Sequence, residues 1–260
     1  MNCFRVLSVA LLGLAGLPGC GDSDEDPPAP VPTPTQTVLN LDDVSENPDS
    51  YTWFEFRPNV MKLILAGAAE TEHIAILWYT VEDGAVGLHY HAKTESVYVI
   101  DGTQTDAKGT YETGTVYFNP PGSGHQVSDS SGFFLLAYSA PPDFSEEAVA
   151  TIEEYEPVTI DTEDDELKEA YDFEDAQTDV ATFSVPTQEG GGLNAAIIET
   201  SSAEDFTYTG NYVLVLEGSC VIDGVPYEEN MLIVEKELVP VPFVVTAASE
   251  STCLALGVSF

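Results

Sequence analysis

Short hydrophobic segments separated by polar or glycine-rich breaks make up most of the chain between residues 38 and 146. The clearest are WFEFRPNVMKLILAG, HIAILWYTV, SVYVI, TVYFN and FFLLAYSA, which are rich in β-branched and aromatic residues. Segments of this length and composition are typical of β-strands. Helical periodicity of useful length is nearly absent, and two segments, SEEAVATIEEY and EDDELKEAYDF, could form short helices. The pattern therefore predicts an all-β fold.

The second half of the chain repeats the pattern of the first half. The segment NYVLVLEGSCVIDGVPYEENMLIV aligns without gaps with ESVYVIDGTQTDAKGTYETGTVYF, and Gly218 corresponds to Gly102 at an offset of 116 residues. Duplication explains this agreement better than the similarity that any two β-rich halves share. We expect one unit over residues 38–146, an acidic connector over 147–185 and a second unit over 186–260. Packing of one unit on the other would cover the edges of their sheets.

Three of the four histidines lie near one glutamate in the first unit, and the fourth, His73, lies outside this pattern. The run HYHAKTESVYVIDG contains His89, His91 and Glu95, and GTVYFNPPGSGHQVSD contains His125. Alternation along a strand would point the first two imidazoles to the same face. Three imidazoles and one carboxylate suit Fe(II), Mn(II), Zn(II), Ni(II) or Cu(II), and they leave positions open for water or substrate. We predict one bound divalent transition metal (Zn, Fe or Mn) rather than an ordinary polar strand face.

These two runs resemble the two signature motifs of the cupin superfamily, His-x-His-x3-Glu-x6-Gly and Gly-x5-Pro-x-Gly-x2-His. The second run also resembles the cupin domain of zinc-binding anti-sigma factors and of related two-cupin proteins. One departure is Asp129, because the family often has Asn four residues after the last histidine. The resemblance implies two jelly-roll β-barrels in tandem, with the four residues above as metal ligands of the first. It does not imply a reaction, because this fold hosts many unrelated functions.

The second unit resembles a cupin that kept its barrel and lost its metal site. The same offset of 116 residues places Asp205, Thr207, Asn211 and Val241 where the four ligands would be, and none of them is histidine. We therefore expect the second barrel to be free of metal and to pack against the first.

The N-terminus has the features of a targeting segment. Arg5 precedes a short apolar run over residues 6–17, which is too short for a stable transmembrane helix. The following LPGC resembles a bacterial lipoprotein signal, so residues 1–19 would be removed and Cys20 would carry lipid. An ordinary secretory signal is the alternative. Residues 20–37 are acidic and proline-rich and are expected to be an extended tether. We expect a protein anchored in the bacterial cell envelope, on the periplasmic or outer-membrane face, or otherwise secreted.

The charge of the chain restricts its partners. The formal net charge is −38, from 45 acidic and 7 basic residues, and such a surface repels nucleic acid and anionic lipid headgroups. We expect a neutral or weakly acidic small molecule as the ligand, and we leave a homodimer open. An anionic ligand would depend on the metal and on Lys93. Cys220 and Cys253 lie in apolar strand-like runs, where a disulfide and two buried thiols are equally compatible with the sequence.

Two classes of function follow from this site. A metal-dependent dioxygenase acting on a small molecule would use the complete ligand set and an aromatic pocket. Its catalytic and substrate-binding residues are not evident from the sequence. The alternative is a non-catalytic, zinc-holding module that binds a ligand or acts as a sensor at the cell envelope; metal storage ranks below both. Five aromatic residues could line the pocket or belong to the core: Trp78, Tyr90, Tyr98, Tyr117 and Phe118.

Overall fold

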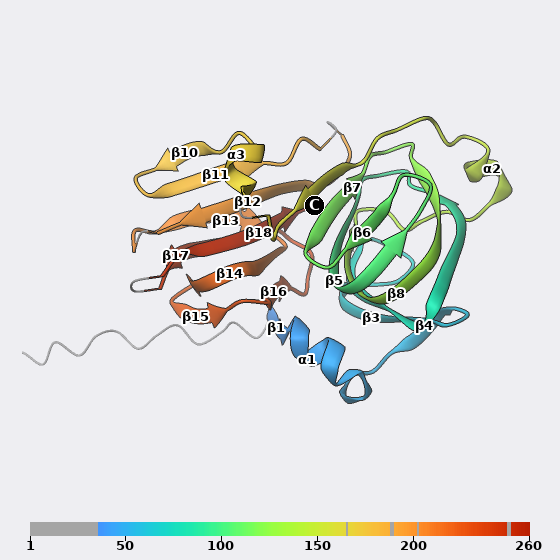
Figure 1. Ribbon diagram of the computed structural model, residues 1–260, viewed down its shortest axis with the longest axis horizontal. Coiled ribbons are helices and arrows are strands. Elements are labelled where there is room, and N and C mark those ends of the chain that lie inside the picture. The colour runs from blue at the N-terminus through green and yellow to red at the C-terminus, as the bar shows by residue number, and fades with distance from the viewer. Residues whose placement is uncertain (1–35, 165, 188–189, 202, 249–250) are drawn as a thin grey trace, which may run out of the picture.

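Two β-barrels built from antiparallel strands lie side by side in the computed structural model (Figure 1). The structure describes residues 36–260 except residues 165, 188–189, 202 and 249–250. The predicted leader over residues 1–19, Cys20 and most of the predicted tether lie outside the described residues. The all-β prediction with two jelly-roll barrels in tandem is confirmed.

The first sheet has eight strands in the described part of the chain, and it carries both histidine motifs. Its strand order is β2-β3-β4-β8-β5-β7-β9, and β6 pairs with β5. The bounds are β2 Phe54–Arg57, β3 Val60–Gly67, β4 His73–Tyr90, β5 Glu95–Thr105, β6 Thr110–Glu112, β7 Thr115–Asn119, β8 Gly124–Tyr138 and β9 Val158–Asp161.

The second sheet has ten strands in the described part of the chain. Its main order is β1-β16-β14-β18-β12-β11-β10, while β15 and β17 also pair with β14, and β13 pairs with β17. The bounds are β1 Gln36–Asn40, β10 Glu174–Gln177, β11 Val180–Ser184, β12 Asn194–Thr200, β13 Phe206–Gly210, β14 Tyr212–Ile222, β15 Val225–Glu228, β16 Met231–Glu235, β17 Val241–Ala247 and β18 Cys253–Ser259.

The internal repeat is visible in the strand registers. In the first barrel the pairing of β5 with β8 shifts between Val99 and Asp101, and in the second the pairing of β14 with β18 shifts between Val215 and Glu217. Each residue of the second pair lies 116 positions after its counterpart, which is the offset seen in the sequence. A β-bulge at the same place in both barrels supports their origin by duplication.

Two of the expected unit boundaries differ from the structure. Residues of the predicted tether and first unit, Gln36 to Asn40, form β1, which pairs with β16 of the second barrel. The chain then crosses to the first barrel through α1, Leu41–Glu46, whose N-terminus is capped by the Asn40 side chain. The predicted connector contributes β9 to the first sheet and β10 and β11 to the second. These strands satisfy backbone groups that would otherwise remain unpaired at the sheet edges.

Helices are few and short in the described residues. α2, Glu146–Val149, and α3, Leu167–Ala170, form in the two segments expected to be helical, and a 3-10 turn covers Pro48–Ser50. Within the described ranges, no helix has the length and apolar character required to cross a membrane.

Buried hydrophobic residues form three clusters. One fills the first barrel and includes Val97, Val99 and Phe134, and another fills the second barrel. The third lies between the barrels, where Ile76 and Leu135 of the first share a core with Leu256 of the second. The two barrels therefore pack on each other through their outer faces, as expected from the sequence.

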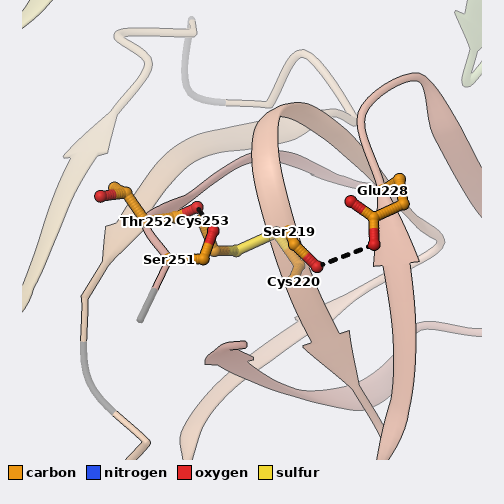
Figure 2. Close-up of a disulfide and its surroundings, with 6 residues drawn as sticks. All are labelled: Ser219, Cys220, Glu228, Ser251, Thr252 and Cys253. Atoms are coloured by element: carbon orange, nitrogen blue, oxygen red, sulfur yellow. Dashed lines mark hydrogen bonds between the residues drawn. A yellow bond between two sulfur atoms is a disulfide. The ribbon is translucent and has the colours of Figure 1, made fainter. Parts of the chain in front are cut away.

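A disulfide joins β14 to β18 in the second barrel (Figure 2). The Cα atoms of Cys220 and Cys253 are 4.9 Å apart, within the range that a disulfide spans, and both residues are fully buried. Beside them, the Ser219 hydroxyl donates a hydrogen bond to Glu228 at 3.2 Å. Of the two alternatives for these cysteines, the structure adopts the disulfide.

Candidate metal centre

The four predicted ligands converge at one end of the first barrel. His89 lies at the end of β4 directly opposite His125 on β8, His91 follows β4 by one residue, and Glu95 begins β5. One ligand atom from each of the four lies within 4.8 Å of all the others. All four side chains are buried, with at most 4% of their surface exposed.

The glycine- and proline-rich turn before β8 places these histidines. The His91 amide donates to the Ser123 carbonyl at 2.9 Å, and the Gly122 amide donates to the His91 carbonyl at 2.8 Å. Gly122 has a φ of +85°, which favours glycine, and a side chain at Gly124 would lie 2.4 Å from the His89 carbonyl oxygen. The turn therefore depends on glycine where the backbone passes close to two of the ligands.

Gly102, the glycine that ends the first motif, lies inside β5. Its φ is +91°, and an added Cβ would lie 2.2 Å from the carbonyl oxygen of Ser131 on β8. The glycine allows the backbones to approach at the bulge, so that β5 continues to Thr105. Asp129 also has a positive φ, +48°, a conformation that both Asp and Asn tolerate. This similarity explains why the departure from the family motif leaves the backbone intact.

Hydrogen bonds orient three of the four ligands. His89 Nδ1 donates to the Gly87 carbonyl at 2.9 Å, and His125 Nδ1 donates to Asp106 Oδ2 at 2.8 Å. Carbonyl and carboxylate oxygens accept only, so these contacts place the proton on Nδ1 and turn Nε2 towards the centre when the ring is neutral. Asn119 Nδ2 donates to Glu95 Oε2 at 2.8 Å.

The electrostatics of the site favour two neutral imidazoles and one protonated imidazole around a carboxylate. Burial lowers the pKa of His89 to about 3 and that of His91 to about 4. Burial opposes ionisation of Glu95, yet the neighbouring His91 and His125 hold the pKa of this carboxyl well below its ordinary value. Burial would also lower the pKa of His125, but hydrogen bonds to Asp106 and Glu95 raise it to about 9. A metal ion would therefore displace one proton, from His125.

His91 provides the test of whether the residues fit a metal. Its Nε2 lies 3.3 Å from Glu95 Oε2, but neither ring nitrogen makes a hydrogen bond. Buried polar groups are rarely left without partners. The His91 imidazole has a free nitrogen that faces a carboxylate and two further imidazoles, and this is the geometry and chemistry of a metal ligand. The four residues fit one divalent transition metal.

A small cavity lies above the four residues inside the barrel. Its volume is about 10 Å³, which leaves room for roughly one water molecule. The hydroxyl of Tyr79 and Oε1 of Gln104 lie in its wall without hydrogen-bond partners, so they could contact a ligand. The lining residues are Phe56, Leu77, Tyr79, Val86, His89, Glu95, Gln104, His125, Val127, Leu136, Tyr138, Pro142 and Phe144.

None of the five aromatic candidates lines this cavity, and of the two alternatives the core holds for most of them. Of the five candidates, Tyr117 belongs to the cluster inside the first barrel, whereas Tyr98 and Phe118 belong to the core between the barrels and Trp78 packs against that core. Tyr90 is half-buried and pairs with Asp143. Strand alternation explains why they divide between two clusters, because neighbouring residues of one strand face opposite sides of the sheet.

Lys93 also has a different role from the one expected. Its Nζ donates to the Gly190 carbonyl of the second barrel at 2.8 Å. Three further residues at the site were not predicted from the sequence: Asp106, Asn119 and Tyr138, whose pKa is held well above its ordinary value by burial and the nearby Glu95 carboxylate. None of these three stands out from neighbouring polar and aromatic residues in the printed sequence.

The second barrel has a different arrangement at the corresponding end. Asn211 takes the place of Glu95. Its backbone carbonyl accepts from the backbone amide of Glu235 at 2.8 Å, and its backbone amide donates to the backbone carbonyl of Val258 at 2.7 Å. Asp205 and Thr207 are exposed, and Val241 pairs with Gly210. Among the described residues, the group that could hold a metal is the one in the first barrel.

Comparisons with known proteins agree with this architecture. Residues 42–141 match the family model of the ChrR cupin-like domain. A solved structure described as a "putative dioxygenase" from Nostoc punctiforme aligns with a TM-score of 0.56 at 10% identity, over 86% of this chain and 82% of that one. A cupin 2 conserved barrel domain protein from Leptotrichia buccalis aligns with a TM-score of 0.50 at 12% identity, over 86% and 96%. None of the curated proteins compared with the chain matches it.

Proposed function

We propose that the first barrel, whose residues 42–141 match the ChrR cupin-like domain, is a mononuclear metal centre that promotes oxidation of a small molecule. The observation that carries the proposal is the set of four buried ligand atoms within 4.8 Å of one another, with both His91 nitrogens lacking a hydrogen bond. Burial of such polar groups costs free energy unless a bound partner, here a metal ion, satisfies them.

The donor set suits oxygen chemistry. When bound by three imidazoles and one carboxylate, a divalent iron or manganese ion keeps one or two positions open, at which it can accept oxygen and an oxygen-bearing ligand. The description of the Nostoc punctiforme protein as a dioxygenase is compatible with this proposal, although the likeness itself concerns the fold.

The surrounding residues have distinct tasks in this proposal. Gly87, Asp106 and Asn119 hold the ligands in position through the hydrogen bonds described above. Val127 and Leu136 keep bulk water from the cavity, which strengthens electrostatic contacts inside it. The Tyr79 hydroxyl and Gln104 Oε1 supply unpaired polar groups that would orient a ligand.

The test is the metal content of natively purified protein, combined with oxygen consumption on small diketones, phenols and thiols. We expect iron or manganese near one ion per chain, and oxygen consumption that Glu95→Ala abolishes and Asn211→Ala preserves. Activity that survives in Glu95→Ala would show that the reaction occurs elsewhere.

A zinc-holding module that binds a ligand without turnover is the second candidate. The observation that favours it is the match of residues 42–141 to the ChrR cupin-like domain. Zinc in the native protein, without oxygen consumption on any of the compounds, would support this candidate over the oxygenase.

We also propose that the chain is attached to the bacterial cell envelope through Cys20. Support comes from the LPGC sequence after a short apolar run, and from the Cys220–Cys253 disulfide, which suits an oxidising compartment. Recovery of a Cys20→Ser variant in the membrane fraction as fully as wild type would contradict the attachment.

A further inference from the structure

Two of the chain's seven basic residues contact aromatic side chains that line the metal cavity. Arg57 Cζ is 4.5 Å and Lys62 Nζ is 4.0 Å from the centre of the Phe56 ring, which forms part of the cavity wall. Arg57 also lies 4.0 Å from the ring of Phe144, another wall residue. In a chain with 45 acidic residues, two cations at one aromatic side chain are an unusual concentration of positive charge.

Lys62 is a buried cation without a carboxylate partner. Only 1% of its surface is exposed, and none of the ion pairs among the described residues involves it. Its Nζ lies 3.2 Å from His73 Nε2. His73 Nδ1 donates to the Thr71 carbonyl at 2.7 Å, so Nε2 is the acceptor. The remaining contacts of the ammonium are the faces of Phe56 and Tyr138.

Burial of the Lys62 side chain destabilises its charged form. Burial lowers the pKa of Lys62 to about 8, the Glu95 carboxylate opposes this shift, and Arg57 adds to it. At neutral pH the side chain is still mostly protonated. The structure thus holds a positive charge in the barrel that one imidazole and two aromatic faces compensate only in part.

Phe56 and Tyr138 connect this charge to the metal site. Both line the cavity, and both contact the Lys62 ammonium. The Glu95 carboxylate also lies close enough to Tyr138 to help burial hold the pKa of its hydroxyl well above the ordinary value. Phe56 is partly exposed and lies on β2, the terminal strand of the main order of the sheet. Rotation of its side chain would enlarge the cavity and open a path to both cations.

We propose that the ligand of this cavity is a small monocarboxylate with a second oxygen group, and that Lys62 and Arg57 bind its carboxylate once Phe56 turns aside. The inference rests on the proposed function, because the second oxygen would face the four-residue centre. The carboxylate supplies the counter-charge that Lys62 lacks, and charge-assisted hydrogen bonds are strong in a water-poor cavity. The acidic exterior still excludes polyanions.

The experiment compares glycolate with glycolamide, which has the same hydroxyl group but no charge. The full chain is loaded with cobalt(II), and changes in its visible absorption bands report binding. We expect Lys62→Met and Arg57→Ala to weaken glycolate binding by roughly tenfold or more, and to leave glycolamide binding unchanged. Lys62→Arg should retain most of the affinity. Lys236→Ala removes an equal charge from the exposed surface of the second barrel and should have no effect.

Several outcomes would overturn the inference while leaving the metal site intact. These are equal binding of the two probes, binding of glycolate by both basic variants as tightly as by wild type, and no response to either probe. Circular dichroism checks the fold of each variant. If Lys62→Met does not fold, the glycolate affinity of Arg57→Ala is the result that tests the inference. If the folded wild type shows no cobalt bands, the proposed metal centre fails instead. Calorimetric titration of the metal-free chain with glycolate then decides whether Lys62-dependent carboxylate binding remains.

Discussion

The two barrels share a backbone plan and differ at the end where the first collects its polar side chains. Glu95 and Asn211 occupy the same place, because each lies beside a residue that ends the neighbouring strand, Asn119 in one barrel and Glu235 in the other. Around Glu95 are three imidazoles. Around Asn211, the ring of Tyr208 packs closely on Gly210 and Gly257.

The cause of this difference is the connection before the central strand. In the first barrel, residues 91–94 separate β4 from β5 and include His91. In the second barrel, Asn211 alone separates β13 from β14, so no residue corresponds in space to His91. The second barrel thus lacks a connection of the length that carries His91 in the first. The site thus depends on one short connection, whereas the barrel persists without it.

The interiors also differ in how they are stabilised. The second barrel has an apolar interior closed by the Cys220–Cys253 disulfide. The first contains buried Lys62 and His73 besides the four candidate ligands. Groups that break the usual rules of burial are expected at functional sites. Among the described residues, the buried histidines, Lys62 and Glu95 lie in the first barrel, whereas Glu235 is the buried charged residue of the second. Four predictions test this division.

The largest effect is expected from His91→Ala. The substitution removes one of four donors, and even the loss of a residue that only orients a ligand costs roughly tenfold to hundredfold in metal affinity. We expect the purified variant to contain almost no metal, as measured by elemental analysis. The matched variant Asn211→Ala, at the other barrel, should keep one ion per chain. Equal metal in wild type and His91→Ala, or a second ion mapped to residues 190–260, would refute the comparison.

The next effect concerns the second barrel. Replacing both Cys220 and Cys253 by alanine opens a covalent loop and should lower the free energy of unfolding by about 3–4 kcal/mol. Denaturant unfolding measures the change, and wild type under reducing conditions serves as the control. Below the unfolding transition the variant should keep its metal. Loss of metal from the folded variant would show that the two barrels are not separable in function.

A smaller effect is expected from Asp106→Asn. The amide oxygen could still accept from His125 Nδ1, but the negative charge that supports the imidazole would be lost. Metal affinity should therefore fall by roughly tenfold to hundredfold, measured by competition with a chelator. Asp129→Asn tolerates the same positive φ and should change nothing.

The pH dependence of Asp106→Asn gives a second measurement. In wild type the pKa of His125 is about 9, so affinity should rise with pH by about tenfold per unit up to that value. Without the Asp106 carboxylate the pKa falls, and the affinity should level off at a lower pH. A pH profile identical to that of wild type would show that Asp106 does not act through His125.

Asp106 illustrates what the sequence could predict. The four ligands were predictable because they lie on short segments whose alternation and turns are local features. Asp106 lies 19 positions before His125 and meets it only because β5 and β8 pair in the closed barrel. No local pattern encodes such a contact.

The same limit applies to the fold. The segment QTVLN can be recognised as a strand, but its pairing with β16 joins residues nearly 200 positions apart. The lysine in MKLIL can be placed on a strand, whereas its burial depends on how β3, β4 and the ring of Phe56 come together. The sequence pattern thus predicted the strands and the metal ligands. The residues that they contact depend on how distant strands pair when the barrels close.

The smallest effect is expected from Lys62→Met, and its sign distinguishes a functional charge from a structural one. The pKa of Lys62 is about 8 in the folded chain and ordinarily 10.5, so between these values the unfolded state binds more protons. Its charge therefore destabilises the fold by about 3 kcal/mol below pH 8, and this cost disappears as pH rises to 10.5. The methionine removes the cost but also the hydrogen bond to His73, worth about 1 kcal/mol. At neutral pH the variant should be more stable by about 2 kcal/mol in denaturant unfolding, and this advantage should vanish by pH 10.5. Lys236→Met, at an exposed position, should stay within about 0.5 kcal/mol of wild type throughout. The opposite outcome is a Lys62→Met variant that is less stable at pH 7, by an amount that does not change between pH 8 and 10.5. It would show that Lys62 stabilises the fold and that its charge does not serve to bind a ligand.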